Sequence, residues 1–356
     1  MKSNVSFFNL LLTAAIFPLL FGCQKGITDN QANPLLSAAK KGSTVTPLGT
    51  TPDVYVAGSD NGQAVYWKNG TETVLTGGQT ATGIVVDGSG NVYVCGYGHS
   101  ATTGLFVAQY WLNGTLTTLS DGTNNVLAEG IALYGTNVYI VGQEGEFVHT
   151  GEYWTNGVAT SLGSGQPNGI FIDASGNIYI PNVISSNTPS YWKNGTLVTL
   201  TGGGVIQAIA VSGTTVYGVG VEYGSAGAET MLLWTNSSSQ TLGPAGTNTN
   251  AMAVALTASG VPVISGTIVG STGNYQIGYW SALGDPDILG TAEFVAATTG
   301  IAVDGTGDVF VCGSQFNSSS TPVAWYWEIP STGSVVPVQL TNGTTSATAL
   351  AIALGQ

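Results

Sequence analysis

The chain has 356 residues and is strongly acidic, with 19 Asp and Glu against 6 Lys and Arg, all six of them lysines, and a formal net charge of −13. Nucleic-acid binding depends on Lys and Arg that neutralise phosphates, so this balance excludes nucleic acid as a partner class. The same shortage of cations argues against a lyase that acts on polyanions.

Residues 1–22 have the organisation of a secretory leader. Lys2 supplies a positive charge, residues 7–21 are an apolar stretch of 15 residues, and Leu20-Phe21-Gly22-Cys23 follows. Such a stretch is too short to favour a membrane-spanning helix. The tetrapeptide resembles a bacterial lipobox, which implies cleavage before Cys23, acylation of its thiol and a lipid anchor in the bacterial cell envelope, at the outer membrane or cell surface. The alternative is an ordinary secreted protein with a chance cysteine.

Residues 23–52 carry no strand pattern and are rich in Thr, Ser, Ala, Gly, Lys and Asn, so we expect a flexible tether behind the acylated cysteine. From residue 53 onward the pattern changes. Seven of the eight tryptophans recur every 38 to 47 positions, usually as Tyr-Trp: Trp67, Trp111, Trp154, Trp192, Trp234, Trp280 and Trp327. A scarce, bulky residue at this spacing indicates one supersecondary unit copied seven times over residues 53–356.

Each unit has the pattern of four short strands, as in 83–87, 91–95, 105–112 and 115–119. These runs are rich in Val, Ile, Tyr and Thr and are bounded by Gly, Asn, Asp and Ser. Several are apolar on both faces, which an antiparallel sheet tolerates when other sheets cover both sides. The predicted fold is therefore all-β, a seven-bladed β-propeller with four-stranded antiparallel blades.

The first strand of each unit has the pattern Ile-x-Val and is expected at Ile84, Ile131, Ile170, Ile209, Met252, Ile301 and Leu350. The first unit starts at Val54 without such a strand, whereas residues 347–354 at the C-terminus supply one more than their own unit needs. The C-terminal strand should therefore complete blade 1, which buries both terminal edges.

Two segments, 83–96 (GIVVDGSGNVYVCG) and 300–313 (GIAVDGTGDVFVCG), resemble the bacterial seven-bladed β-propeller repeat, with a looser likeness to NHL repeats. The Tyr-Trp-x-Asn-Gly segments are similar to repeats of bacterial extracellular propellers. The resemblance covers roughly residues 53–356 and implies the fold. It implies no catalytic residue, because the matching positions are turn and core positions.

The turns predict two different faces of the ring. Tight Asp-x-x-Gly turns such as 87–91, 173–177 and 304–308 and the Asn-Gly turns should share one face, and longer, variable connections should open on the other. We expect Asx-turn chemistry rather than calcium binding in the tight turns. Cys95 and Cys312 occupy equivalent positions and are expected as small buried residues without a disulfide. Binding residues concentrate on variable loops, so the long-loop face and the axial mouth are the predicted ligand side.

Candidate ligand contacts on that side are aromatic and titratable side chains of different blades: Tyr97, His99, Glu144, Glu146, Phe147, His149, Tyr223, Tyr275 and Phe316. The group Glu144, Glu146, His149 and Glu152, with His99 one blade away, could in principle bind an ion or act as acid and base. Glu152 is expected at the start of a strand, and acidic loop residues are commonly solvated. We therefore expect no catalytic residue, no metal and no cofactor.

The sequence thus predicts a monomeric, membrane-anchored propeller outside the cytoplasm, a non-catalytic module that binds a protein or glycan. One alternative is a carbohydrate-active enzyme that uses loop carboxylates such as Glu144, Glu146, Glu222 or Glu229. The other is a purely structural surface protein. Paired carboxylates about 5 to 9 Å apart across the axial mouth would favour the enzyme.

Overall fold

The computed structural model describes residues 51–145, 149–183, 188–224, 229–242, 249–269, 275–281, 286–289 and 295–355, without the side chains of 295–299. The expected leader, Cys23 and all but the last two residues of the expected tether lie outside these ranges. In the part of the chain that the structure describes, no helix is long and apolar enough to cross a membrane.

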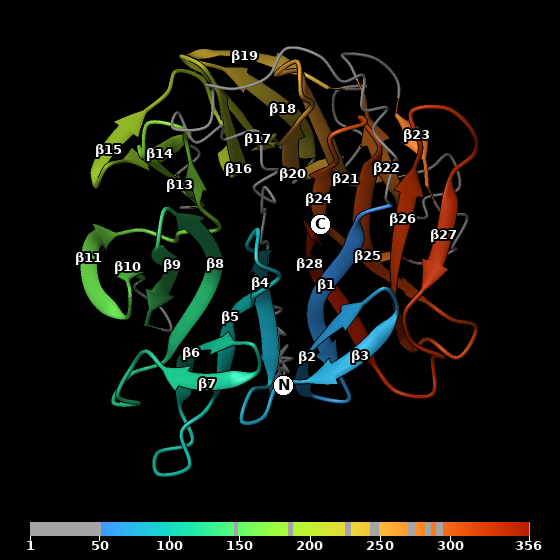
Figure 1. The fold of residues 1–356 in the computed structure, drawn as a ribbon. Coiled ribbons are helices and arrows are strands. Elements are labelled where there is room, and N and C mark those ends of the chain that lie inside the picture. Colours follow the sequence, from blue (N-terminus) through green and yellow to red (C-terminus); the bar gives the residue numbers. More distant parts are fainter. Residues whose placement is uncertain are drawn as a thin grey trace, which may run out of the picture.

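Figure 1 shows seven four-stranded antiparallel sheets arranged as blades around a central axis. From axis to rim, blades 1 to 3 are β28 (Ala347–Gly355), β1 (Asp53–Asp60), β2 (Gln63–Lys68), β3 (Thr71–Val74); β4 (Thr80–Val86), β5 (Val92–His99), β6 (Phe106–Leu112), β7 (Thr115–Thr118); and β8 (Val126–Tyr134), β9 (Asn137–Glu144), β10 (Thr150–Thr155), β11 (Val158–Ser164). Blades 4 and 5 are β12 (Phe171–Ile172), β13 (Ile178–Asn182), β14 (Ser190–Lys193), β15 (Thr196–Thr199); and β16 (Val205–Ser212), β17 (Thr215–Tyr223), β18 (Glu229–Thr235), β19 (Ser238–Thr241). Blades 6 and 7 are β20 (Asn250–Leu256), β21 (Pro262–Val269), β22 (Tyr275–Trp280), β23 (Asp287–Ile288); and β24 (Val295–Val303), β25 (Val309–Phe316), β26 (Pro322–Ile329), β27 (Val336–Gln339).

The C-terminal strand closes the ring as the sequence predicts. β28 pairs with β1 along its whole length, from Asp53 opposite Gly355 to Asp60 opposite Ala347. Because β28 also packs between the inner strands β24 and β4, the last strand of the chain joins the first and last blades. All seven repeated tryptophans are almost completely buried between blades, which confirms their role in packing.

Two positions of the predicted inner-strand repeat are wrong. In every blade except blade 4, the inner strand contains a β-bulge, an extra residue without a cross-strand partner. Met252 and Leu350 occupy the bulges of blades 6 and 1. The residues equivalent to Ile84 are instead Val254 and Ile352. Apolar residues stand at both places, so the alternation of the sequence does not reveal where the extra residue lies.

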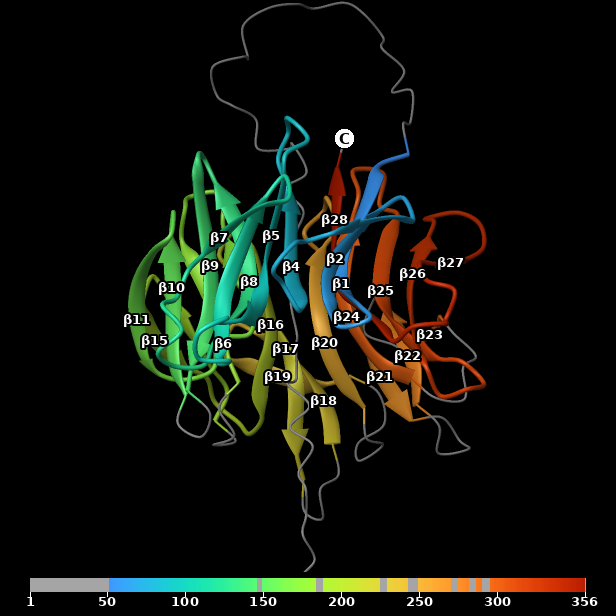
Figure 2. The same cartoon turned by 90° about the horizontal axis from the view of Figure 1, so that it is seen from below.

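The two faces of the ring differ in their turns as expected. On the short-turn face, the Asn113 side chain of the β6–β7 turn donates to Asn91 of the β4–β5 turn at 3.0 Å. On the long-loop face, Thr103 of the β5–β6 loop donates to the Gly122 carbonyl of the connection to blade 3 at 2.8 Å. The start of β1 and the end of β28 lie together on the short-turn face, at the upper edge of Figure 2.

The Asn-Gly turns explain how each outer hairpin is held in register. Asn69, Asn113, Asn156 and Asn194 have φ values of 49° to 50° and are each followed by a glycine with positive φ, a conformation that Asn and Gly tolerate best. The Asn113 side-chain oxygen also accepts a hydrogen bond from the Val92 amide at 2.8 Å. The residue that makes the turn therefore also ties it to the beginning of the second strand.

Candidate functional site

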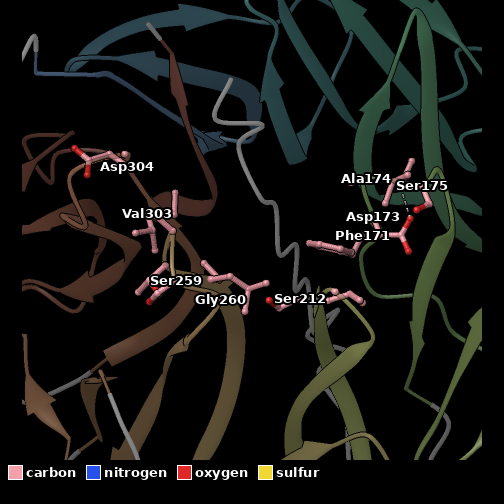
Figure 3. Close-up of a pocket in the computed structure, with 18 residues that line it drawn as sticks. Phe171, Asp173, Ala174, Ser175, Ser212, Ser259, Gly260, Val303 and Asp304 are labelled. Carbon is pink, nitrogen blue, oxygen red and sulfur yellow. Dashed lines mark hydrogen bonds between the residues drawn. The ribbon is translucent and has the colours of Figure 1, made fainter. Parts of the chain in front are cut away.

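A pocket of about 390 Å³ lies on the short-turn face, at the axial ends of blades 4 to 7. Its residues come from the ends of β12, β16, β20 and β24 and from the tight turns that follow them, as Figure 3 shows for nine of them. The volume falls in the range of roughly 300 to 1,000 Å³ that is usual for small-ligand sites. We expected the ligand on the long-loop face, whereas this pocket lies on the opposite face of the ring.

The pocket has an apolar floor and a rim of small polar groups. Val211, Leu256 and Val303 are buried apolar residues at the ends of their inner strands. The rim carries the hydroxyls of Ser175, Ser212, Thr257 and Ser259. No Lys or His belongs to the described lining, so the pocket offers apolar contact and hydroxyl groups rather than positive charge.

The two carboxylates in the lining hold the turns together. Asp173 accepts hydrogen bonds from the Ser175 and Asn177 amides at 2.9 Å, from the Asn177 side chain and from the Tyr179 hydroxyl. Burial raises the pKa of Asp173, but these hydrogen bonds outweigh burial and leave the pKa below its ordinary value. Asp304 accepts from the Thr306 amide and hydroxyl and from the Asp308 amide. This pattern confirms the Asx-turn interpretation of these segments.

The predicted ligand contacts of blade 2 form an aromatic group at the long-loop end of the blade. His99 stacks on Phe106 with ring centroids 4.6 Å apart, and its Nδ1 donates to the Gly104 carbonyl at 2.9 Å. Tyr97 meets the same Phe106 ring edge-on at 5.2 Å. Tyr97 lies within β5 rather than in a loop and is only 5% exposed, so little of it is available to a ligand. Burial also raises its pKa.

The acidic candidates of blade 3 are partly brought together. Glu144 ends β9 and accepts a hydrogen bond from the Asn124 side chain. Glu152 lies inside β10 rather than at its start, and burial, followed by the charge of Glu144, raises its pKa. Burial lowers the pKa of His149. Glu146 and Phe147 lie outside the described residues.

The remaining candidates lie in separate blades and do not converge. Tyr223 ends β17, Tyr275 begins β22 and Phe316 ends β25, each at the long-loop end of its blade. Tyr223 and Tyr275 are 41% and 48% exposed. Among the described residues, no group of three or more His, Cys, Asp or Glu is arranged to hold a metal ion.

Comparison with known proteins agrees with the architecture. The family model of the SBBP β-propeller repeat matches residues 75–101, a span that covers β4, β5 and the tight turn between them in blade 2. This match and the seven four-stranded blades closed by β28 support the same architecture. The chain is a seven-bladed β-propeller repeat protein.

Among solved structures, the propeller is similar to one titled "Streptogramin B lyase structure", with 13% sequence identity and a TM-score of 0.45. The similarity covers 74% of this chain and 92% of the other. No curated protein matches the propeller significantly.

The structure also brings out two features that the sequence interpretation missed. Phe106, whose ring contacts the rings of both His99 and Tyr97, was expected only as a strand residue. Glu129 in β8 is buried at 3% exposure, and burial raises its pKa to about 8. A lone glutamate between Ala128 and Gly130, inside an otherwise apolar strand, was the available signal for Glu129.

Proposed function

We propose that this propeller is a lipid-anchored binding module of the cell envelope that recognises a neutral glycan without catalysing its conversion. The observation that supports this function most directly is the pocket at the short-turn end of blades 4 to 7. Sugar rings present apolar C–H faces together with hydroxyl groups, and the pocket combines buried aliphatic side chains with serine and threonine hydroxyls.

The charge distribution favours a neutral ligand over an acidic one. The only lysines of residues 53–356 are Lys68 and Lys193. Lys68 forms an ion pair with Asp53 at 2.7 Å in blade 1, and Lys193 lies over the Tyr179 ring, 5.2 Å from its centroid. Neither lines the pocket, so an anionic polysaccharide would find no counter-charge there.

The expected lipid anchor and the pocket belong to the same side of the propeller. The chain enters the propeller at the start of β1, on the same face as the pocket. With Cys23 acylated, the expected flexible tether of residues 23–52 would keep the propeller close to the membrane, where envelope glycans are available. The long-loop face offers a second surface for a protein partner, with the partly exposed Tyr223 and Tyr275 at its blade ends.

A matched pair of substitutions tests the pocket. Ser175 and Ser89 occupy the same place in the tight turns of blades 4 and 2, both are exposed, and each backbone amide donates to the turn aspartate at 2.9 Å. Only Ser175 lines the pocket. Ser175→Trp should therefore obstruct the pocket, and Ser89→Trp should change the surface without reaching it.

The measurement is binding of the residue 24–356 fragment to an array of neutral envelope glycans, followed by calorimetry with each glycan that binds. We expect Ser175→Trp to weaken binding at least tenfold and Ser89→Trp to leave it unchanged, with equal melting temperatures. Equal binding by both variants would refute the pocket as the site. Release of shortened products during the incubation would instead support the carbohydrate-active enzyme.

A further inference from the structure

Glu129 is a carboxyl group buried in an innermost strand of the propeller. It occupies the bulge of β8, where Ala128 and Gly130 pair with Gly142 and Val141 and Glu129 has no cross-strand partner. Its side chain is 3% exposed. A buried carboxylate is strongly unfavourable unless a cation or several donors accompany it, and both lysines of the propeller are engaged elsewhere, in blades 1 and 4.

Gln143 on the neighbouring strand is the hydrogen-bond partner of Glu129. Gln143 pairs with Leu127 in the β8–β9 ladder, and Leu127 precedes Glu129 by two residues. The Gln143 side chain forms a hydrogen bond with the Glu129 carboxyl. An amide supplies the donor in this bond through its nitrogen, since a carboxylate only accepts. Among the described residues, two buried oxygens have no hydrogen-bond partner, Oε2 of Glu129 and Oε1 of Gln143.

One proton would satisfy both oxygens. If Glu129 is ionised, both atoms are acceptors and neither can bond the other. If Glu129 carries a proton on Oε2, this hydroxyl can donate to the Gln143 carbonyl while the Gln143 amide donates to Oε1. A buried polar group that remains unpaired destabilises the folded state, so the shared proton stabilises both groups.

We propose that Glu129 is a neutral carboxylic acid that forms a cyclic, doubly hydrogen-bonded pair with Gln143, and that loss of its proton opens this pair at the long-loop end of blade 3. The proton moves between the Glu129 oxygen and solvent, and no other bond changes.

Among the described residues, the groups that act on Glu129 carry no positive charge that would favour its ionised form. On the side of blade 2, Glu129 interacts electrostatically with Cys95 and Tyr97, whose pKa values burial raises, to about 12 for Cys95. Both groups are neutral at ordinary pH. The residue after Gln143 is Glu144, itself acidic and near Glu152. Burial raises the pKa of Glu129 to about 8, and the Gln143 hydrogen bond offsets only part of this effect.

The pair lies just inside the last residues of β9. Glu144, next to Gln143, pairs with both Val126 and Thr150, and the Gly145 amide donates to the Asn125 carbonyl at 2.9 Å. These contacts begin the loop that carries the acidic candidates of blade 3. Opening the pair would therefore loosen the strand ends that support this loop.

The direction of the pH effect follows from proton binding. Between a pH of about 4.5, the ordinary value for Glu, and about 8, the folded protein keeps a proton that the unfolded chain releases. The folded state binds more protons across this window, so its stability falls as pH rises and levels off above about 8. Below about 4.5 both states carry the proton, and Glu129 contributes no pH dependence.

The test compares wild type with Glu129→Gln, using the nearby Glu144→Gln as a matched control. A glutamine at 129 can still donate to Gln143 and accept from it, so Glu129→Gln should keep the pair at every pH. We expect the melting temperature of wild type and Glu144→Gln to fall by several degrees between pH 5 and 8. That of Glu129→Gln should lack this decrease and should match wild type at pH 5. After correction for the intrinsic rise of amide exchange with pH, exchange of residues 126–129 and 141–144 should accelerate between pH 5 and 8 in wild type and in Glu144→Gln, but not in Glu129→Gln.

Carbon-detected NMR of the glutamate carboxyls gives a direct second measurement. The resonance that disappears in Glu129→Gln should titrate well above pH 6. Titration near 4.5 would overturn the proposal, as would a Glu129→Gln variant that melts far below wild type at pH 5. A rise in melting temperature at pH 8 on addition of Na⁺ or Ca²⁺, absent in Glu129→Gln, would also overturn it, because a metal cation and not a proton would then neutralise the carboxyl.

Discussion

At the scale of single residues, each repeated tryptophan fills the space between two neighbouring blades with its buried ring. The Trp111 indole nitrogen donates to the Thr76 carbonyl in the connection that enters its blade, at 3.2 Å. Glycines in the same kind of connection lie directly under a ring: a Cβ at Gly78 would approach Trp111 to 2.5 Å, and one at Gly165 would approach Trp192 to 2.3 Å. The tryptophan ring therefore packs in the space that the glycine leaves free because it has no Cβ atom.

Two tryptophans of one strand allow this role to be tested. Trp327 occupies the repeated position in β26 and is 1% exposed, whereas Trp325, the eighth tryptophan, is only partly buried two residues earlier. Trp327→Ala should lower the free energy of unfolding by about 3 to 5 kcal/mol, the usual cost of emptying a buried aromatic site. Trp325→Ala should cost clearly less. Urea unfolding of both variants measures these changes. An equal decrease in the free energy of unfolding for both variants would contradict the packing role of the repeated tryptophan.

At the scale of strands, the bulge and the glycine opposite it form the recurring feature of the inner hairpin. Gly58, Gly96, Gly142, Gly220 and Gly266 all sit in the second strand of their blade, and a Cβ on any of them would lie 1.8 to 2.2 Å from a carbonyl oxygen of the inner strand. The register shifts beside these positions. A side chain there would force the two strands apart.

The close approach of the glycine matters most in blade 1, because no turn connects its inner strand β28 to β1 and only hydrogen bonds hold the two strands together. Gly58→Ala brings a methyl group onto the Thr348 carbonyl of β28, and Gly142→Ala makes the same clash in blade 3, where a short turn connects β8 and β9. We expect both to destabilise, but only Gly58→Ala to accelerate amide exchange across residues 347–355 and promote aggregation through the freed edge. Exchange in β28 that stays as slow as in wild type would argue against closure by this strand.

At the scale of the whole molecule, both ends of the closed ring and the pocket share the short-turn face. A lipid anchor ahead of β1 would therefore be attached on the same side as the pocket, with the expected flexible tether of residues 23–52 between them. A single acyl chain binds membranes only marginally, whereas several chains on one cysteine bind firmly, at about 0.8 kcal/mol per buried methylene. We therefore expect membrane anchoring to depend on acylation of Cys23.

Cys23→Ser should release the protein from the membrane fraction or leave an unprocessed precursor, as measured by fractionation and by mass spectrometry of the N-terminus. Cys95→Ala is the matched control, since Cys95 is a buried thiol without a disulfide and its removal leaves the lipobox intact. This control should remain in the membrane fraction. A processed Cys23→Ser protein that still sediments with membranes would contradict the lipoprotein assignment.

Most of the fold could be predicted because its signals are local and repeated. Asn-Gly makes the outer hairpin turn of blades 1 to 4, and a tryptophan every 38 to 47 residues marks each blade. The prediction failed at Met252 and Leu350, where an extra residue in the strand leaves no trace in an apolar run. The candidate site was less predictable, since Tyr97 looked like a loop residue and is a buried strand residue.

The sequence by itself determined the number of blades, the four-strand unit, the closing strand and the two kinds of turn, because each depends on residues close together in the chain or on their periodic recurrence. Only the tertiary structure decided where the pocket lies and which side chains form it, because its walls come from four blades whose turns are about 40 or more residues apart. The pairing of Glu129 with Gln143 likewise follows from a strand bulge and its register, and burial between blades is what changes the chemistry of that carboxyl.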